Sequence, residues 1–263
     1  MKLELYQVDA FTDVLFKGNP ACVVPLNDWL PDEILLNIAR ENAVAETAFF
    51  LNNGQEEIHL RWFTPEIEMD LCGHATLAAA HCLISILNYK SNIIVFETKS
   101  GKLTVTCEND SYYLDFPSRM PVKSDLPNII SRSLNIQPKE IYKSRDYILV
   151  YDSEDDIKNI RIDRSIFDLI NLDPGGVVVT ARGANSDFVS RCFTPQATIL
   201  EDPVTGSAHC SLVPFWTKRL NKKDLFAIQL SERRGELYCQ QQDERVIIAG
   251  KAKTYFSGNL WTE

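Results

Sequence analysis

Glu46 is a carboxyl group in an otherwise apolar stretch, the run AETAFFL at residues 45–51. A carboxyl group can remove a proton from carbon and return it elsewhere when burial or a neighbouring carboxylate brings its pKa toward neutrality. We therefore take Glu46 as a candidate acid/base. The alternative, from the sequence alone, is a strand glutamate that faces solvent.

A second group of candidates is consecutive: Cys72, Gly73 and His74 precede an alanine-rich stretch. His74 can donate to a substrate carboxylate or pass a proton, although a lone histidine beside an apolar helix is more often structural. Cys72 is either a thiol acid/base or a small buried apolar residue, and we favour the second interpretation.

The third group is Asp202, Gly206 and Ser207, in the string EDPVTGSAHC at 201–210. Asp202 is a candidate acid/base, or a helix cap, since aspartate is a preferred capping residue. Ser207 either caps the helix or hydrogen-bonds a ligand. We also hypothesise that Asp202 and Glu46 lie close enough to share one proton at neutral pH, as paired carboxyls do. His81 and His209 are interpreted as core or helix-face residues.

These candidates need helices and strands to position them. The stretch 74–87 has no charged side chain apart from its two histidines, which is typical of a buried helix. Two further helices are predicted, from Pro31 to about Glu41 and from about 206 to 220. The remaining pattern is mostly of strands. They are predicted at 3–8, 21–24, 46–51, 58–63, 92–98, 102–108, 112–116, 140–151, 175–181, 187–194, 226–231, 236–241 and 246–253, with a turn at 52–54.

The sequence contains an internal repeat. Residues 61–80 align with 191–210 without a gap, and both segments contain Arg followed by Phe-Thr-Pro, at 63–65 and 193–195. The alignment places Cys72 opposite Asp202, and residues 73–76 opposite 203–206. If two duplicated lobes face each other, both helix amino termini point into the cleft between them. Such termini offer unpaired N–H groups and a partial positive charge, which suit a carboxylate.

This pattern predicts an α+β fold of two similar lobes related by a pseudo-two-fold axis. Each lobe is expected to be a curved mixed sheet wrapped around a central buried helix. The Pro-containing polar stretch 117–127 marks the boundary, so we expect lobes at 1–117 and 118–263, with final strands that can return to the first lobe.

Composition excludes several functions. The net charge of −9 argues against a nucleic-acid partner. The seven cysteines are never spaced as CxxC, which favours reduced thiols over a disulfide framework or a zinc site. We find no signal peptide and no apolar run long enough to cross a membrane, so we expect a cytoplasmic protein without a membrane partner.

Four strings resemble the phenazine biosynthesis-like (PhzF) family: QVDAFTDVLFKGNPACVV (7–24), ENAVAETAFF (41–50), LCGHATLAAAH (71–81) and EDPVTGSAHC (201–210). They occur in order across nearly the whole chain. The resemblance implies a diaminopimelate-epimerase-like fold, a homodimer, and catalysis without metal, flavin, nicotinamide or pyridoxal cofactor.

By motif, Glu46 corresponds to the family's acid/base, and His74, Asp202 and Ser207 to its other polar site residues. Gly73 and Gly206 would bring backbone N–H groups close to the ligand. The related epimerases use two cysteines, whereas the alignment leaves at most one thiol here. We therefore expect a cofactor-independent isomerase that moves a proton on a small cyclic or amino-acid-like carboxylate. The alternatives are a racemase or epimerase with two opposed bases, and a non-catalytic binding protein.

Overall fold

The computed structural model of the protein describes residues 1–51, 58–172 and 175–262, and these form two compact units. Unit 1 comprises Met1–Phe116 and Ile247–Glu263, and unit 2 comprises Pro117–Val246. The range 118–263, expected as one lobe whose last strands can return to the first, is thus divided, because residues 247–263 belong to unit 1. The turn predicted at 52–54 lies outside the described residues.

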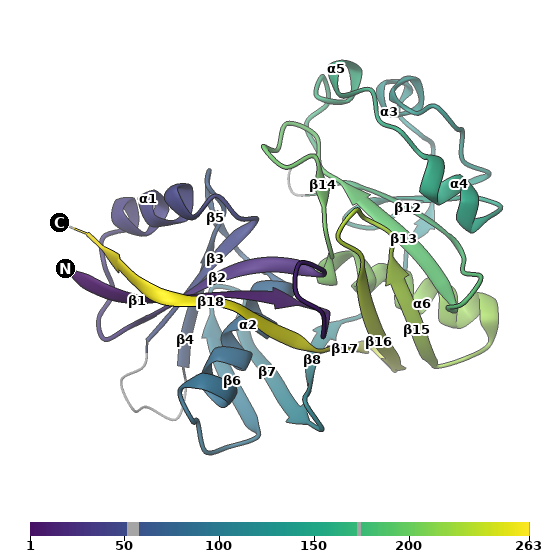
Figure 1. The fold of residues 1–263 in the computed structure, drawn as a ribbon. Coiled ribbons are helices and arrows are strands. Elements are labelled where there is room, and N and C mark those ends of the chain that lie inside the picture. The colour runs from purple at the N-terminus through teal and green to yellow at the C-terminus, as the bar shows by residue number, and fades with distance from the viewer. Residues whose placement is uncertain (52–57, 173–174, 263) are drawn as a thin grey trace. The chain divides into compact units, whose positions relative to one another are not determined.

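Unit 1 is built on a mixed sheet with the order β18-β1-β2-β3-β4-β6-β7-β8, and β5 pairs with β4 (Figure 1). The pairs β2–β3 and β4–β6 are parallel and the others are antiparallel. The strands are β1 (Lys2–Ala10), β2 (Asn19–Leu26), β3 (Glu46–Leu51), β4 (Ile58–Phe63), β5 (Glu68–Met69), β6 (Ile93–Thr98), β7 (Gly101–Glu108), β8 (Ser111–Pro117) and β18 (Ala252–Trp261).

Helices cover both faces of this sheet. Helix α2 (Gly73–His81) packs on β1, β2 and β3, and its residues 73–80 are all buried, as its apolar composition predicted. Helix α1 (Asp32–Asn42) covers the other face, where Leu35 and Ile38 pack with Val24 and Phe49 of β2 and β3. The predicted helix at 74–87 begins one residue earlier, and after His81 it continues as a π-helix, η1 (Cys82–Ile86).

Within unit 2 the strands pair in the order β9-β10-β11-β12-β13-β15-β16, and β14 pairs with β13. Its strands are β9 (Val122–Lys123), β10 (Glu140–Lys143), β11 (Tyr147–Val150), β12 (Val177–Arg182), β13 (Phe188–Phe193), β14 (Glu201–Asp202), β15 (Asp224–Gln229) and β16 (Gly235–Gln242). Strand β17 (Arg245–Gly250) begins in unit 2 and ends in unit 1.

The core of unit 2 lies on both faces of this sheet. Helix α6 (Gly206–Leu220) begins and ends where the sequence predicted, and packs on β15 and β16. The sequence did not predict three short helices, α3 (Asn128–Ser133), α4 (Glu154–Asn159) and α5 (Arg164–Phe167). Ile157 of α4 and Phe167 of α5 are fully buried against alternate residues of β12, including Val177 and Val179.

The two units repeat one pairing pattern. Along β1-β2-β3-β4-β6-β7 and along β10-β11-β12-β13-β15-β16, the pairs run antiparallel, parallel, antiparallel, parallel and antiparallel. The side chains repeat as well. Arg61 Nε lies 2.7 Å from Glu68 Oε1, and Arg191 Nε lies 2.7 Å from Glu201 Oε1. Each guanidinium also lies over the phenylalanine of its Phe-Thr-Pro segment. The predicted internal repeat is therefore confirmed.

The gap-free alignment of the repeat is wrong beyond the Phe-Thr-Pro segments. Phe63 pairs with Glu68, whereas Phe193 pairs with Glu201, so unit 2 has three additional residues between these positions. From there to the helix start the spacing is the same again, because α2 begins at Gly73 and α6 at Gly206. Asp202 is therefore equivalent to Met69 of β5, rather than to Cys72.

The corrected equivalence pairs Gly73 with Gly206, and His74 with Ser207. Cys72 corresponds to Thr205, and these two residues precede their helices in similar extended conformations, with φ of −141° and −112°. A glycine that opens each helix is thus part of the repeat, whereas the side chains on either side of it differ between the units.

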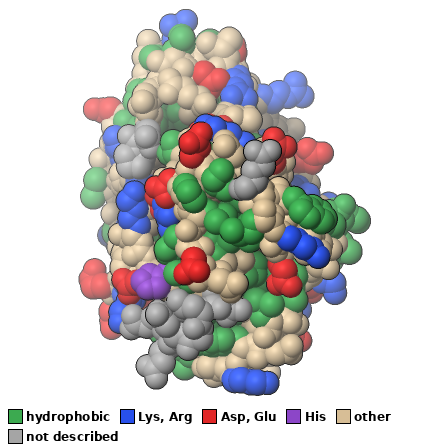
Figure 2. Space-filling model, turned by 90° about the vertical axis from the view of Figure 1, so that its left-hand side faces the viewer, with side chains coloured by type: hydrophobic (Ala, Val, Ile, Leu, Met, Phe, Trp, Pro, Cys, Tyr) green, Lys and Arg blue, Asp and Glu red, His purple; other side chains and the backbone are tan. Residues whose placement is uncertain are grey.

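At the surface, hydrophobic side chains gather over the centre of the face that Figure 2 shows, among acidic and basic groups. Within the described residues, no helix has both the length and the apolar character that a membrane span requires.

Acid should destabilise the protein through His209. This side chain is fully buried in α6, packs against Phe188, and donates from Nδ1 to the Thr205 carbonyl at 2.8 Å. Burial lowers the pKa of His209 from 6.5 to about 4. Its neutral form therefore contributes stability above pH 6.5, and this contribution is lost as the pH falls toward 4, by about 3 kcal/mol in all.

We expect His209→Gln to reduce the fall in unfolding free energy between pH 6.5 and pH 4, measured by urea denaturation at several pH values. His59→Gln is the matched control, because it makes the same substitution at a histidine that is exposed on β4. Equal slopes for wild type and His209→Gln would show that another group controls acid stability.

Candidate active site

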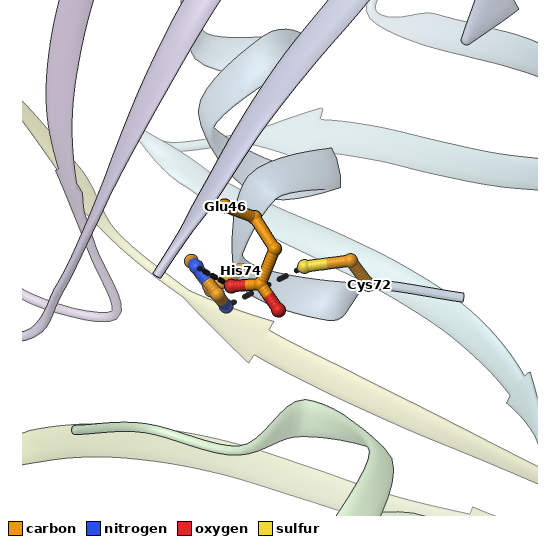
Figure 3. A group of neighbouring side chains, drawn as sticks. All are labelled: Glu46, Cys72 and His74. Atoms are coloured by element: carbon orange, nitrogen blue, oxygen red, sulfur yellow. Dashed lines mark hydrogen bonds and ion pairs between the residues drawn. The ribbon is translucent and has the colours of Figure 1, made fainter. Parts of the chain in front are cut away.

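Glu46, His74 and Cys72 form one cluster in unit 1 (Figure 3). Glu46 is the first residue of β3 and pairs with Ala21 of the parallel strand β2. His74 is the second residue of α2, and Cys72 directly precedes that helix. The sheet therefore presents the carboxyl group, and the first turn of the central helix presents the imidazole and the thiol.

The imidazole of His74 lies between the other two groups. Its Nε2 is 3.1 Å from Glu46 Oε2, which makes an ion pair when the ring is protonated. Its Nδ1 is 3.6 Å from Cys72 Sγ and 3.1 Å from Nδ2 of Asn19, a buried residue of β2. In the neutral ring Nδ1 can accept from the Asn19 amide, and in the imidazolium it can donate to the sulfur. In both protonation states of the ring, Nδ1 of His74 thus has a hydrogen-bond partner.

The three side chains differ in their access to solvent. His74 is 3% exposed and Cys72 is 5% exposed, whereas the Glu46 side chain is 15% exposed. Glu46 is thus the group of this cluster that an approaching molecule can reach most readily. One of its oxygens, Oε2, is buried and has the imidazole as its ionic partner.

The charges of the cluster shift two of its pKa values. Burial disfavours the His74 imidazolium, but the negative charges of Cys72 and Glu46 outweigh this effect, so the pKa of His74 lies well above its usual value. For the Cys72 thiol, burial and the Glu46 charge raise the pKa, and the nearby His74 opposes them only in part. A negative charge on either neighbour thus favours the imidazolium of His74, whereas burial favours the neutral thiol of Cys72.

The helix start beside the cluster is an additional source of positive potential. The N-cap residue Cys72 makes no side-chain capping hydrogen bond, and no acidic residue occupies the first turn of α2. The N–H groups of that turn thus retain their partial positive charge, which favours a negative group nearby.

The cluster also has the donor types of a metal site, since one ligand atom of each of Glu46, Cys72 and His74 lies within 4.8 Å of the others. The imidazole, however, faces the carboxylate with Nε2 and the thiol with Nδ1. A single ion can bind only one of these nitrogens, and an ion at Nδ1 would have to displace Asn19. The observed arrangement fits a proton-transfer group better than a metal centre.

Asp202, Gly206 and Ser207 lie together in unit 2, at the start of α6. Asp202 does not cap this helix: the N-cap residue is Thr205, whose hydroxyl donates to Asp202 Oδ2 at 2.6 Å. Ser207 lies inside the first turn and does not cap it either. Its hydroxyl accepts from Arg145 Nη2 at 3.4 Å. The sharing of a proton between Glu46 and Asp202 stays a prediction, because these residues belong to different units.

The sequence did not single out Asn19 or Arg145. Asn19 is part of the family-like string at 7–24, so its position in the GNPA segment was an available signal. Arg145 follows Ser144 in a polar stretch without any motif, and only the fold brings it to α6. His81 and His209 are helix-face and core residues, as predicted, since His81 contacts Tyr112 and Thr254.

Comparison with known proteins agrees with this architecture. An uncharacterized isomerase of Pseudomonas aeruginosa is 48% identical over 260 residues, which cover 99% of each chain. The crystal structure of a PhzF family phenazine biosynthesis protein from Enterococcus faecalis matches over 100% of both chains, with 44% identity and a TM-score of 0.94. The structure of a predicted epimerase from Pseudomonas aeruginosa, at 19% identity, shares the fold with a TM-score of 0.74 over 99% of this chain and 100% of that one.

These similarities confirm the predicted fold class, the diaminopimelate-epimerase-like arrangement of two similar units that each hold a mixed sheet and a central helix. The predicted enzyme class, an isomerase, is the class under which the bacterial relatives are named. The family described as phenazine biosynthesis-like protein matches residues 8–258. The chain therefore belongs to the phenazine biosynthesis-like (PhzF) protein family.

Proposed function

We propose that this chain is an isomerase that moves a proton on a small carboxylated substrate, with Glu46 as the acid/base and without a cofactor. The observation that carries the proposal is the contact of 3.1 Å between Glu46 Oε2 and His74 Nε2 at the start of a buried helix. The pair holds a carboxylate at a solvent-accessible edge of a buried cluster, and that is what proton abstraction from carbon requires.

In the proposed reaction Glu46 takes a proton from one carbon of the substrate and returns it to another. The electron pair left on the first carbon moves through the conjugated substrate, so the double bond shifts and no electron leaves the molecule. His74 contacts the carboxylate through Nε2 and Asn19 and Cys72 through Nδ1, and we assign it a positioning role: its imidazolium orients Glu46. The N–H groups near Gly73 would stabilise negative charge on the substrate.

The helix start beside the cluster supports a small carboxylated substrate. The N-cap residue of α2, Cys72, makes no side-chain capping hydrogen bond, and the first turn of this helix has no acidic residue. Free N–H groups at a helix start favour carboxylate ligands. The expected homodimer remains a prediction from the family resemblance, and the cytoplasmic location remains a prediction from the sequence.

A racemase or epimerase with two opposed bases is the second candidate, because the Cys72 sulfur lies against the same imidazole as Glu46. In that reaction a thiol and a carboxyl would act on opposite sides of one carbon. The raised pKa of Cys72 weighs against it, since a buried neutral thiol is a poor base.

Glu46→Gln should abolish hydrogen exchange between solvent and substrate. We would incubate a panel of small cyclic and amino carboxylates in D₂O and follow deuterium uptake by mass spectrometry. Loss of the only acid/base should slow exchange by roughly 10²- to 10⁴-fold. Glu41→Gln is the matched control, because Glu41 lies in α1 and is exposed. Unchanged exchange in Glu46→Gln would refute the assignment.

Cys72→Ser separates the two candidate reactions. If Glu46 alone carries the proton, the serine variant should keep exchange within about 10-fold of wild type, because the substitution changes only the contact of this side chain with His74 Nδ1. The position of deuterium in the product, read by NMR, gives an independent answer. Inversion at a single carbon, together with complete loss of exchange in Cys72→Ser, would establish the epimerase instead.

A further inference from the structure

Asn19 is a fully buried polar residue of unit 1 that contacts the acid/base cluster. It opens β2, pairs with Ala10 of β1 and is 0% exposed. Gly18 allows the chain to enter the strand there, because it has a φ of +66° and a Cβ at this position would lie 2.1 Å from the Ala10 carbonyl oxygen. The backbone thus holds the Asn19 amide beside α2, where its Nδ2 lies 3.1 Å from His74 Nδ1.

This contact determines which nitrogen of the neutral ring carries the proton. An amide nitrogen only donates, so His74 Nδ1 must accept, and an accepting ring nitrogen carries no hydrogen. The proton of the neutral ring then lies on Nε2, the nitrogen 3.1 Å from Glu46 Oε2. In the other neutral tautomer, Nδ1–H would face the amide N–H groups of Asn19, and a bare Nε2 would face the carboxylate. Both of these contacts would be repulsive.

Cys72 is the alternative partner of His74 Nδ1. Its Sγ lies 3.6 Å from this nitrogen and can accept from it when the ring is doubly protonated. The ionisable groups that act on His74 are Glu46 of β3 and Cys72 before α2, and a negative charge on either favours the imidazolium. The Asn19 amide is uncharged and stabilises the neutral ring instead. In the imidazolium and in the tautomer that Asn19 selects, an N–H group of the ring faces Glu46.

The selected tautomer suits a carboxylate that must accept a proton from carbon. Burial disfavours both charges of a carboxylate–imidazolium pair, and transfer of the Nε2 proton to Glu46 would remove both. That transfer leaves the remaining ring proton on Nδ1, where the Asn19 amide disfavours it. Glu46 therefore stays ionised. Because its Oε2 is buried against the ring, Oε1 is the oxygen that can take a proton from the substrate.

The internal repeat gives the position that is equivalent to Asn19. Thr47 and Val177 are equivalent, because each pairs with the phenylalanine of its Phe-Thr-Pro segment. The β2 residue opposite Thr47 is therefore equivalent to the β11 residue opposite Val177. Asn19 precedes the first of these by three residues, and Ser144 precedes the second by three residues. Asn19 and Ser144 thus occupy the same place in the two units.

Unit 2 lacks the amide, the imidazole and the carboxylate together, since the equivalent positions are Ser144, Ser207 and Gly176. The Ser144 hydroxyl lies 2.7 Å from the hydroxyl of Ser211 in α6. Unit 2 keeps the same strand pairing without an amide at this place, so the pairing does not require Asn19. The amide occurs in the unit that has an imidazole to orient and a carboxylate beside it.

We propose that Asn19 is a positioning residue of the proton-transfer site: its amide directs the proton of the His74 ring to Nε2 and thereby keeps Glu46 in the carboxylate form. This inference rests on the proposed function for its catalytic meaning, and all of its residues lie in unit 1. Asn19 acts through His74 and not on the substrate. It determines which protonation state of the cluster is ready to accept a proton.

The test is the ¹⁵N NMR spectrum of the imidazole rings in the full chain, labelled at its four histidines. A ring nitrogen without a proton resonates far downfield of a protonated one, so the spectrum identifies the tautomer. His74 is assigned by the signals that disappear in His74→Gln. In wild type we expect His74 Nδ1 to lose its proton on titration to alkaline pH, while Nε2 keeps its proton.

Asn19→Asp keeps the shape of the side chain and replaces the donor by an acceptor. Its carboxylate should hold a proton on His74 Nδ1 at the pH where wild type has lost it. The kcat of exchange should fall roughly 10- to 100-fold, with KM nearly unchanged. Asn42→Asp is the matched control, because the Asn42 amide donates to Thr47, the neighbour of Glu46, at 3.0 Å. It should leave the tautomer of His74 unchanged.

Two results would overturn the inference. One is a wild-type His74 whose Nδ1 keeps its proton at every pH at which the chain is folded. The other is an Asn19→Asp ring with the same protonation as wild type, since a merely structural role of Asn19 would lower stability without moving the proton. Thermal unfolding reports whether the variants fold. The wild-type spectrum needs no variant, so it decides the question if Asn19→Asp does not fold.

The outcome is separable from that of the proposed function, because the spectrum requires neither substrate nor turnover. Loss of exchange in Glu46→Gln, together with an unchanged tautomer in Asn19→Asp, would disprove the role of Asn19 alone. Normal exchange in Glu46→Gln, together with a proton moved to Nδ1 in Asn19→Asp, would disprove the acid/base and leave the selection of the tautomer intact.

Discussion

The negative charge of Glu46 is the constraint on which unit 1 depends. One carboxylate oxygen is buried without a hydrogen bond in the described structure, and a buried charge without a partner costs several kcal/mol. The imidazole of His74, 3.1 Å away, offsets this cost, and the amino terminus of α2 adds favourable potential. The helix must therefore start close to the end of the sheet that begins β3. Its alanines at positions 75 and 78–80, all buried, allow that approach.

The duplication explains how one backbone framework presents two different sets of side chains. Both units use the same order of strand pairs and the same ion pair between arginine and glutamate to hold the segment before the central helix. This shared framework determines where the central helix begins. It also determines which two positions, one on the strand and one in the helix, lie at the helix start. The side chains at these positions can differ, because the arginine–glutamate ion pair and the glycine that opens the helix maintain the backbone geometry. In unit 1 they supply a carboxylate and an imidazole, and in unit 2 a hydroxyl with an arginine beside it.

The elements with strong periodicity were predicted from the sequence. Strands β3 and β4 and helix α6 have their predicted bounds, because alternation and apolar runs determine them locally. The helices α3, α4 and α5 were missed, since each has at most six residues and depends on packing against β11 to β13 for its stability. A gap-free alignment cannot detect the three additional residues after Phe193, and only the strand pairing located them. Arg145 was missed for a similar reason, because its contact with Ser207 joins residues far apart in the sequence.

The corrected alignment bears on whether two opposed bases can invert a carbon of the substrate. Inversion by a matched pair of thiols needs a cysteine before each central helix. Cys72 has this position in unit 1, but its counterpart in unit 2 is Thr205, whose hydroxyl already donates to Asp202. A threonine hydroxyl is not a base at neutral pH, and the Cys72 thiol is itself buried with a raised pKa. The repeat thus lacks the symmetric pair of bases. In unit 1 the partly exposed carboxyl of Glu46 lies beside the His74 imidazole, and such a group can take a proton and return it on the same face of a substrate.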